Sequence, residues 1–312
     1  QMLDDDPKNA EVLFPFLNGR DLNGDPEQNP SRWVINFWDW PEERAAAYRL
    51  PYEHILEHVK PERQRKKDNG EFKLRNPLPQ RWWIYADKRP ALYHAIGRGE
   101  LFENHPIGWV PGTSPLGRVL VYATQASKYS NFSFLSGQIV FSHAVGVVAT
   151  DGFHDQIVLS SSLHTVWAFN YGGRLETRLR YAPTDCLENF PFPSQDNLVF
   201  QGETFQTARI QAQRAEGHGL TQLYNDLHSP EKHSSEIEAL RNLHHEIDIA
   251  VSKAYGWDDL DLQNDFHEVG YLPDNDNIRF TISEEARIEV LHRLADLNKE
   301  RYDDEVARGL HE

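Results

Sequence analysis

The sequence has almost no cysteine and no long hydrophobic run. Cys186 is the single cysteine among 312 residues, so no internal disulfide can form and nothing points to secretion. No apolar stretch reaches the roughly 18 residues that a membrane-spanning helix needs. The first ten residues, QMLDDDPKNA, are acidic and polar, unlike a signal peptide. We therefore expect a cytoplasmic protein with no membrane partner. Because the chain begins with Gln1, we interpret it as a fragment of a longer protein.

The sequence also lacks the motifs of self-contained catalytic sites. It contains no GxGxxG or GxxxxGK[ST] loop, no HExxH and no GxSxG elbow. A single cysteine cannot supply the paired CxxC of a zinc site. We therefore expect no catalytic residue, no metal-ligating residue and no cofactor-binding residue in this chain.

The single cysteine lies in the stretch RLETRLRYAPTDCLENFPFP, residues 174–193, shortly after three arginines. A nucleophilic thiol needs a neighbouring base or cation, and the chain has 15 histidines that could serve. However, Leu187 and Phe190 flank Cys186, and a lone cysteine among apolar residues is typically a small buried hydrophobe. We favour packing, and a Cys/His hydrolase remains the weaker alternative.

Charge is unevenly distributed along the chain. Residues 1–59 hold 5 Lys+Arg against 12 Asp+Glu, residues 60–200 hold 16 against 12, and residues 201–312 hold 11 against 24. The overall charge of −16 argues against a simple nucleic-acid binder, because a protein that grips phosphates needs Lys and Arg. The mildly basic middle is the part that could meet an anion, and solvated charge without a partner is the alternative.

The apolar periodicity divides the chain near residue 198 and predicts an α+β fold. Before residue 198 we expect short strands and helices, and after it helices only. The expected elements are strands at 10–22 (ending in an Asn-Gly turn), 32–38 and 81–85, a helix from 41 to about 59, a helix at 90–96, β structure at 118–150, and helices at 155–170, 203–228, 234–255 and 283–309. The expected domains are an N-terminal strand-helix segment (1–60), a mixed α/β domain (61–197) and a helical C-terminal domain (198–312).

Nine segments carry a family resemblance in their order along the chain. They are VLFPFLNGRDLN (12–23), SRWVINFWDWPEERA (31–45), VKPERQRKK (59–67), RWWIYADKRPALYHAI (81–96), VLVYATQASK (119–128), LSSSLHTVWAFNYGGRLETRLRYAPTDCLENFPFP (159–193), LYNDLH (223–228), AYGWDDLDL (254–262) and RFTISEEARIEVLHRLADLNKERY (279–302). Together they resemble the C-terminal half of large bacterial restriction-modification DNA methyltransferases, of the Type IIG or MmeI-like group, and of related phage-defence methyltransferases. The resemblance spans nearly the whole chain.

The resemblance implies a target-recognition region that reads a DNA site, followed by a helical segment. In such enzymes a separate, more N-terminal domain binds S-adenosylmethionine and methylates adenine N6. The Asn-Pro-Pro-aromatic motif of that domain is absent, since NPSRW (29–33) and NPLPQRW (76–82) lack the second proline. We therefore expect double-stranded DNA and a methyltransferase domain or subunit as partners, no cofactor in this chain, and S-adenosylmethionine in the missing domain. Whether this chain alone has enzymatic activity remains open.

Charge and loop position nominate the residues that would meet DNA. Loop-borne Arg and Lys contact phosphates, while polar side chains read base edges in the major groove. The expected phosphate-contacting residues are Arg65, Lys66, Lys67, Lys73, Arg75, Arg81, Arg89, Arg174, Arg178 and Arg180. The expected base-reading residues are Lys128, Tyr129, Asn131, Ser142 and His143.

A second hypothesis is a protein–protein docking module. In this interpretation the acidic helical part joins a separate methyltransferase or defence-system subunit, and DNA is touched only in the assembly. The apolar stripes at 237–251 and 288–297 suit either an internal helical bundle or such an interface.

Overall fold

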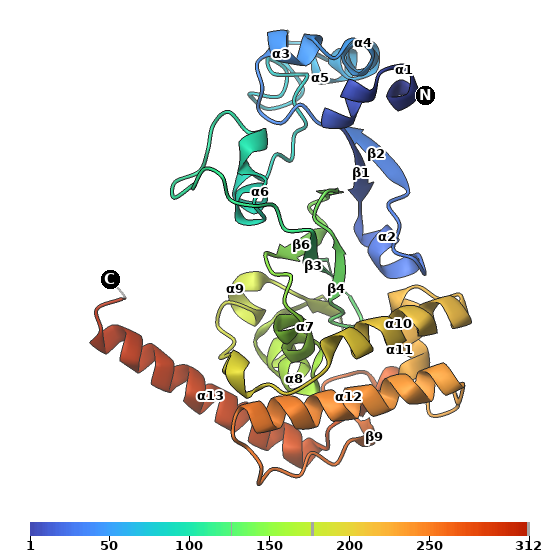
Figure 1. Cartoon of the computed structure of the whole chain (residues 1–312), viewed down its shortest axis with the longest axis vertical. Coiled ribbons are helices and arrows are strands. Elements are labelled where there is room, and N and C mark those ends of the chain that lie inside the picture. The colour runs from blue at the N-terminus through green and yellow to red at the C-terminus, as the bar shows by residue number, and fades with distance from the viewer. Residues whose placement is uncertain (126, 176–177, 311–312) are drawn as a thin grey trace.

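The chain does not follow the long axis of the molecule in simple order, because β1 and β2 connect the N-terminal end to α2, which lies beside α10 and α11 (Figure 1). The structure is a computed structural model and describes residues 1–125, 127–175 and 178–310. Helices α1 and α3–α5 lie at one end, a small sheet lies in the middle, and the long helix α12 lies at the other end (Figure 1). Helices mixed with small, mostly antiparallel sheets confirm the expected α+β class.

The N-terminal part runs to the end of η2. Its elements are α1 (Met2–Asp5), η1 (Pro7–Glu11), β1 (Leu13–Leu17), α2 (Gly19–Gly24), β2 (Arg32–Ile35), α3 (Glu42–Ala46), α4 (Arg49–His58), α5 (Lys60–Arg63), α6 (Pro90–Ala95) and η2 (Gly99–Leu101). Pro90 starts α6 as expected, because proline is tolerated at the first helical position.

Three predictions for this part are wrong. The expected Asn-Gly turn is the start of α2, because the Asn18 side chain accepts hydrogen bonds from the backbone N–H groups of Arg20 and Asp21 and caps a helix. The single helix expected from 41 to 59 is two helices, α3 and α4. Residues 81–85 form turns instead of a strand, and Trp82 and Ile84 are apolar there because they pack in the core.

The middle part begins with a three-stranded antiparallel sheet. Its elements are β3 (Arg118–Ala123), β4 (Ser133–Ser136), β5 (Val140–Phe141), β6 (Val145–Val148), α7 (Phe153–Ser160), α8 (Ser162–Tyr171), β7 (Gly173–Leu175), β8 (Arg178–Arg180), α9 (Pro183–Cys186) and η3 (Gln195–Asn197). The strands confirm the β structure expected at 118–150, and their order in the sheet is β4-β3-β6. The helix expected at 155–170 is interrupted, because Ser161 caps α8 by accepting a hydrogen bond from the His164 N–H.

The C-terminal part is mainly helical. Its elements are α10 (Gly202–Glu216), α11 (Leu220–Leu227), α12 (Ser235–Ala254), β9 (Asp265–Glu268), η4 (Asp274–Asp276), β10 (Ile278–Thr281) and α13 (Glu284–Ala307). Gly217, at φ 67°, separates α10 from α11 within the helix expected at 203–228. The β9–β10 hairpin is an element that the periodicity did not predict.

The three parts share buried residues. One apolar cluster includes Val12 from the N-terminal part, Val121 from the sheet and Leu294 from α13. Strand β1 also pairs in parallel with β5, which ties the first strand to the middle of the chain. The expected boundary at 60/61 falls inside helix α5. The three-domain division therefore stays a prediction.

Candidate nucleic-acid interface

The loop between β3 and β4 carries three of the residues expected to read bases, Lys128, Tyr129 and Asn131. Backbone hydrogen bonds of 3.0 Å run in both directions between Ser127 and Leu179. They place the β7–β8 hairpin directly beside this loop. The structure thus brings together two segments that lie about 50 positions apart in the sequence.

The β7–β8 hairpin presents two arginines on one face. Arg178 and Arg180 are exposed on either side of the buried Leu179, and alternate residues of a strand point the same way. Arg174, across the hairpin, is partly engaged, because its Nη2 donates to the Phe169 carbonyl at 2.7 Å and its guanidinium lies 5.3 Å from the centre of the Tyr271 ring. Arg178 and Arg180 are therefore the arginines of this hairpin best placed to contact a phosphate.

The C-terminal part holds Lys128 and Tyr129 in place. The Lys128 Nζ lies 2.9 Å from Asn225 Oδ1 and 2.9 Å from Asp276 Oδ1. The Tyr129 hydroxyl donates to the same Asn225 oxygen at 2.9 Å, and the Tyr129 ring stacks on His228 at 5.0 Å between centroids. Burial raises the pKa of Tyr129, so its hydroxyl stays protonated and can donate.

Three of the expected base-reading residues lie inside the protein. Tyr129, Asn131 and Ser142 are 9%, 8% and 5% exposed, and the Ser142 Oγ accepts a hydrogen bond from the Ala144 N–H. Their burial favours a structural role for these side chains in this conformation. His143 is exposed and Lys128 is partly exposed, so base reading by these two stays a prediction.

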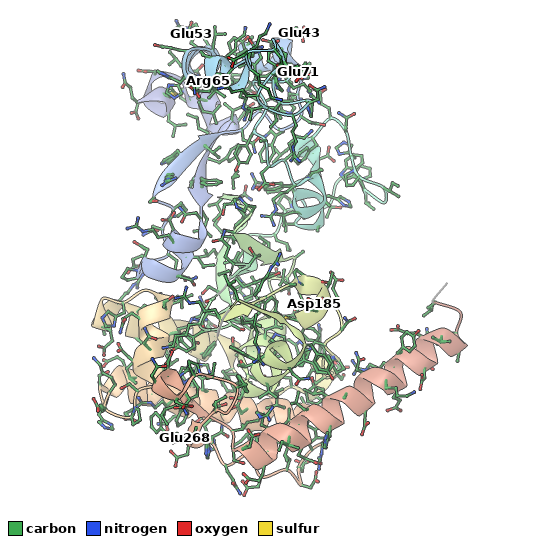
Figure 2. The ribbon with its side chains drawn as sticks, turned by 180° about the vertical axis from the view of Figure 1, so that it is seen from behind. Glu43, Glu53, Arg65, Glu71, Asp185 and Glu268 are labelled. Atoms are coloured by element: carbon green, nitrogen blue, oxygen red, sulfur yellow. The ribbon has the colours of Figure 1, made fainter. Side chains whose placement is uncertain are left out.

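The expected phosphate contacts at 65–75 form a second basic surface. Arg65, Lys66, Lys67, Lys73 and Arg75 are all exposed in the loop after α5. Figure 2 places Arg65 at the N-terminal end of the molecule, close to Glu43, Glu53 and Glu71, whereas Asp185 lies in the middle part. Arg65 pairs with Glu62 at 2.5 Å and Lys67 with Glu71 at 3.5 Å. This basic loop is therefore separate from the Lys128 loop and partly neutralised by acidic neighbours.

Arg81 and Arg89 bind backbone carbonyls of the protein itself. The Arg81 Nη2 donates to the Asp39 carbonyl at 2.6 Å. The Arg89 Nη1 donates to the carbonyls of Ser142 at 3.0 Å and Val145 at 3.1 Å. Both guanidinium groups thus brace neighbouring segments, and any phosphate contact by them would compete with these bonds.

Sequence reasoning missed the residues that support the Lys128 loop, the loop between β3 and β4. Asn225, His228, Asp276 and Arg279 lie in the C-terminal part, on or next to α11 and β10. They are about a hundred or more positions away from Lys128, so no local pattern could have paired them with the loop. The segment LYNDLH (223–228), which is part of the family resemblance, contains Asn225 and His228 but does not indicate what they contact.

Cys186 is buried, as predicted. Burial raises the pKa of its thiol to about 11, and a protonated thiol is a poor nucleophile. Its Sγ faces the Ala168 carbonyl at 3.8 Å. The packing interpretation is therefore confirmed, and this environment opposes the hydrolase alternative.

One group of possible metal ligands lies together among the described residues. Glu216, His218 and Asp226 offer ligand atoms within 4.8 Å of one another. The His218 Nδ1 lies 2.7 Å from Asp226 Oδ2, and the Ser234 hydroxyl donates to Glu216 at 2.5 Å. These hydrogen bonds account for the arrangement without an ion.

Within the described part of the chain, no helix has both the length and the apolar character needed to cross a membrane.

Comparisons with known proteins relate the chain to restriction-modification enzymes that read DNA. Residues 117–194 match the family described as "MmeI, target recognition domain", and this range contains the Lys128 loop and the β7–β8 hairpin. The fold is similar to that of a solved structure of the Type IIL restriction-modification enzyme MmeI in complex with DNA, with a TM-score of 0.56 and 18% identity. The match covers 96% of this chain and 33% of that chain, so the chain spans about a third of the enzyme's length. No curated protein matches the chain. The resemblance to MmeI-like enzymes is thus confirmed.

Proposed function

We propose that this chain is the DNA target-recognition region of a restriction-modification enzyme. The observation that carries the proposal is the match of residues 117–194 to a target-recognition family. The likeness of the fold to an enzyme solved together with DNA supports it. The matched range contains the loop and the hairpin that the geometry brings together.

The arrangement suits groove recognition on physical grounds. Recognition residues sit on loops that a rigid scaffold positions, and here the scaffold is the β4-β3-β6 sheet buttressed by α11. Arg178 and Arg180 would contact the backbone phosphates, while Lys128 and His143 would approach base edges. The exposed residues of the 65–75 loop would add phosphate contacts at a second place on the duplex.

The finer part of the proposal concerns the rest of the enzyme. We propose that the parent protein methylates adenine N6 with S-adenosylmethionine in a part that this chain does not contain, and that it serves a restriction or phage-defence system. A base to be methylated must leave the stack, so one domain takes the flipped base while another holds the surrounding duplex. That division of labour is consistent with the absence of the Asn-Pro-Pro-aromatic motif from this sequence.

The second candidate is a docking module that touches DNA only within an assembly. The acidity of the C-terminal part favours it, since residues 201–312 carry 11 Lys+Arg against 24 Asp+Glu. Such a surface repels a polyanion and suits a basic partner protein. In this case the isolated chain would bind DNA weakly.

The test is selection of randomised duplex DNA by the purified chain at low salt, followed by affinity measurements against salt. An enriched motif together with a steep salt dependence would establish a self-sufficient reader. Binding without an enriched motif would contradict independent sequence reading and leave a phosphate-gripping surface. Absence of binding at low salt would favour the docking module.

A further inference from the structure

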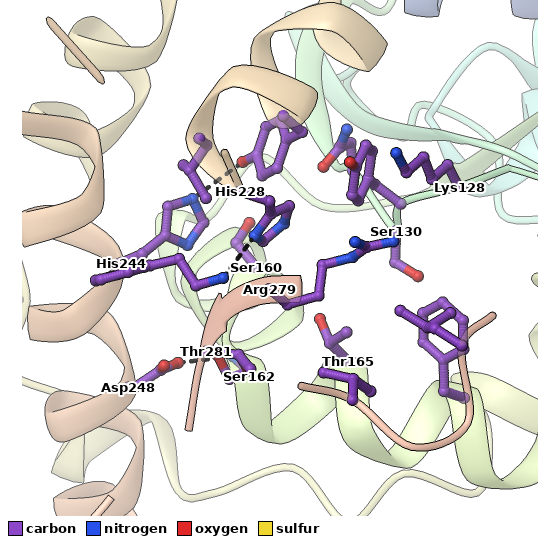
Figure 3. Close-up of a pocket in the computed structure, with 18 of the residues that line it drawn as sticks. Lys128, Ser130, Ser160, Ser162, Thr165, His228, His244, Asp248, Arg279 and Thr281 are labelled. Atoms are coloured by element: carbon purple, nitrogen blue, oxygen red, sulfur yellow. Dashed lines mark hydrogen bonds between the residues drawn. The ribbon is translucent and has the colours of Figure 1, made fainter. Parts of the chain in front are cut away.

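A small cavity lies where the middle and C-terminal parts meet. Its volume is about 70 Å³, and its walls come from the Lys128 loop, α7, α8, α11, α12 and the β9–β10 segment. Figure 3 shows Arg279 crossing this cavity from β10 toward Lys128. One buried water needs only about 15 Å³ measured this way, so the space exceeds what a single water would fill.

Two hydroxyl groups of the cavity wall lack a hydrogen-bond partner within the described part of the chain. The Oγ atoms of Ser130 and Ser160 are buried, and neither has a hydrogen-bond partner among the described residues. Figure 3 shows Ser130 beside the tip of Arg279 and Ser160 beside His228. A buried hydroxyl without a partner is destabilising, so an occupant that forms hydrogen bonds would be favoured here, and a hydroxyl can donate to an oxygen of that occupant.

His228 adds a third donor. Its Nδ1 accepts a hydrogen bond from the Phe280 backbone N–H at 3.1 Å, so this nitrogen carries no proton. Burial and the positive charge of Arg279 hold the pKa of His228 well below its usual value, so the ring is neutral. A neutral ring with an unprotonated Nδ1 carries its proton on Nε2. The second nitrogen of His228 is therefore a donor.

Arg279 supplies the charge. It is buried, and its hydrogen bonds to the described residues, to Asp276 at 3.2 Å and to the Ile278 carbonyl at 2.7 Å, both come from Nη1. Arg279 lines the cavity. A guanidinium group donates up to five hydrogen bonds and matches the two oxygens of a carboxylate.

The charges around the cavity limit the charge of the occupant. Lys128, Arg279 and Asp248 line it, and Asp276 pairs with both cations. Asp248 accepts hydrogen bonds from the Ser162 N–H and from Asn264, each at 2.6 Å. With both aspartates ionised the four charges cancel, and with Asp248 protonated they sum to one positive charge. A singly charged anion would balance the protonated state.

We propose that this cavity is a binding site for a small singly charged oxyanion of the carboxylate type. Its oxygens would accept from Ser130, Ser160, His228 and Arg279, and its apolar end would lie against Phe169 and Tyr271. Such a ligand would bridge the Lys128 loop to α7 and β10, and so would couple the recognition region to the C-terminal part. The proposal does not depend on DNA binding.

The experiment is an NMR titration of the isotope-labelled 312-residue chain with acetate, and with acetamide as a neutral probe of nearly equal shape. We expect saturable, one-to-one shifts at the lining residues with acetate, and at least tenfold weaker binding of acetamide. The double variant Ser130→Ala with Ser160→Ala should bind acetate at least tenfold more weakly. The matched control is Ser194→Ala, since Ser194 is exposed and lies outside the cavity lining.

Acidity provides a second readout. Burial raises the pKa of Asp248 to about 6, and the groups that face it are His244, His245, Ser162, Asn264 and, across the cavity, His228 and Arg279. Acetate should bind several-fold more tightly at pH 5.5 than at pH 7.5, and Asp248→Asn should remove most of this difference.

Equal binding of acetate and acetamide, unsaturable shifts, or unchanged binding by the double serine variant would each overturn the proposal.

Discussion

At the scale of single residues, Asn225 connects the candidate interface with the C-terminal part. One oxygen accepts hydrogen bonds from both Lys128 Nζ and the Tyr129 hydroxyl, each at 2.9 Å. Asp276 provides the other partner of Lys128. Through the Ser127–Leu179 backbone pair, the same clamp reaches the β7–β8 hairpin. A helix of the C-terminal part thereby sets the position of two segments of the recognition region.

Replacing Asn225 by alanine should loosen the loop and the hairpin together. The Tyr129 hydroxyl would lose its acceptor within a buried site, which costs about 1–3 kcal/mol. Hydrogen exchange at the amides of Ser127 and Leu179 should become faster. Thr221→Ala, an exposed position on the same helix, is the control. Unchanged exchange at both amides would show that Asn225 does not position this loop.

Replacing Cys186 by serine should affect stability alone. The thiol is fully buried and faces the Ala168 carbonyl at 3.8 Å, and a hydroxyl placed there would be poorly satisfied. Chemical denaturation should show a loss of about 1–2 kcal/mol, with DNA affinity at low salt unchanged. The native thiol should react with a disulfide reagent only as fast as the protein opens. Rapid reaction of the folded protein would mean an accessible, activated thiol.

At the scale of elements, short pieces of secondary structure present charge while buried side chains fix them. The β7–β8 hairpin is only three residues long on each side, and Leu179 anchors it. Helix α10 anchors the sheet in a similar way, because the buried Arg209 donates to the Phe132 carbonyl at 2.5 Å and to Ser133 Oγ at 3.0 Å. The exposed arginines of the hairpin can therefore be replaced without disturbing the β4-β3-β6 sheet or the buried Leu179.

The double variant Arg178→Ala with Arg180→Ala should weaken DNA binding and flatten its salt dependence. Loss of two phosphate contacts should lower the slope of log affinity against log salt by about 1.8, at roughly 0.9 per contact. Fluorescence anisotropy with a labelled duplex between low and moderate salt measures this slope. Arg308→Ala, which removes an exposed arginine near the end of α13, is the control for loss of a surface arginine elsewhere.

The same assay separates the two basic surfaces. Arg65→Ala with Lys66→Ala removes two exposed charges from the loop near the N-terminal end. A reduced slope would mean that bound DNA reaches both surfaces. If only the hairpin variant changes the slope, the 65–75 loop is excluded from the interface. Equal slopes for the hairpin variant and the Arg308 control would exclude the hairpin.

At the scale of the whole molecule, one continuous core joins the three parts. The largest apolar cluster extends from Val12 to Leu294, so folding of the recognition sheet and of the helical part should be cooperative. Asp248 lies at the seam between α8 and α12, where it binds the Ser162 N–H and Asn264. It is 1% exposed, which makes the stability of this seam sensitive to pH.

The pH dependence of stability near Asp248 has a definite sign. Burial raises the pKa of the carboxyl from an ordinary value of 3.8 to about 6. Between these values the folded state holds a proton that the unfolded state has released, so this contribution to stability falls as the pH rises from 3.8 to 6. The full penalty above pH 6 is of the order of 3 kcal/mol, from about two pKa units at roughly 1.4 kcal/mol each.

Replacing Asp248 by asparagine should remove that contribution. The new amide oxygen can accept from the Ser162 N–H, and a flipped Asn264, whose Oδ1 has no partner among the described residues, can accept from the new amide nitrogen. The variant should therefore be at least as stable as the native chain at pH 7.5, and its advantage should shrink toward pH 4.5. Urea denaturation of the native chain and of the variant at several pH values measures the difference in stability and its dependence on pH. An advantage that is equal at all pH values would contradict the assigned ionisation.

The sequence by itself determined the features that depend on neighbouring residues. The α+β class, the start of α6 at Pro90, the start of α13 within one residue of the expected position 283 and the burial of Cys186 all follow from composition or short-range patterns. The family strings also led to a recognition region that the match at 117–194 confirms. Such signals survive in sequence because caps, turns and periodic apolar faces act over a few residues.

The tertiary structure alone decided what surrounds each candidate residue. It buried Tyr129, Asn131 and Ser142, turned Arg81 and Arg89 onto internal carbonyls, and set the β7–β8 hairpin beside the Lys128 loop. It also supplied Asn225 and Asp276 as partners from about 100 and 150 positions further along the chain. Charge and loop position in a sequence cannot reveal these outcomes, because burial and pairing depend on which distant segments fold against one another.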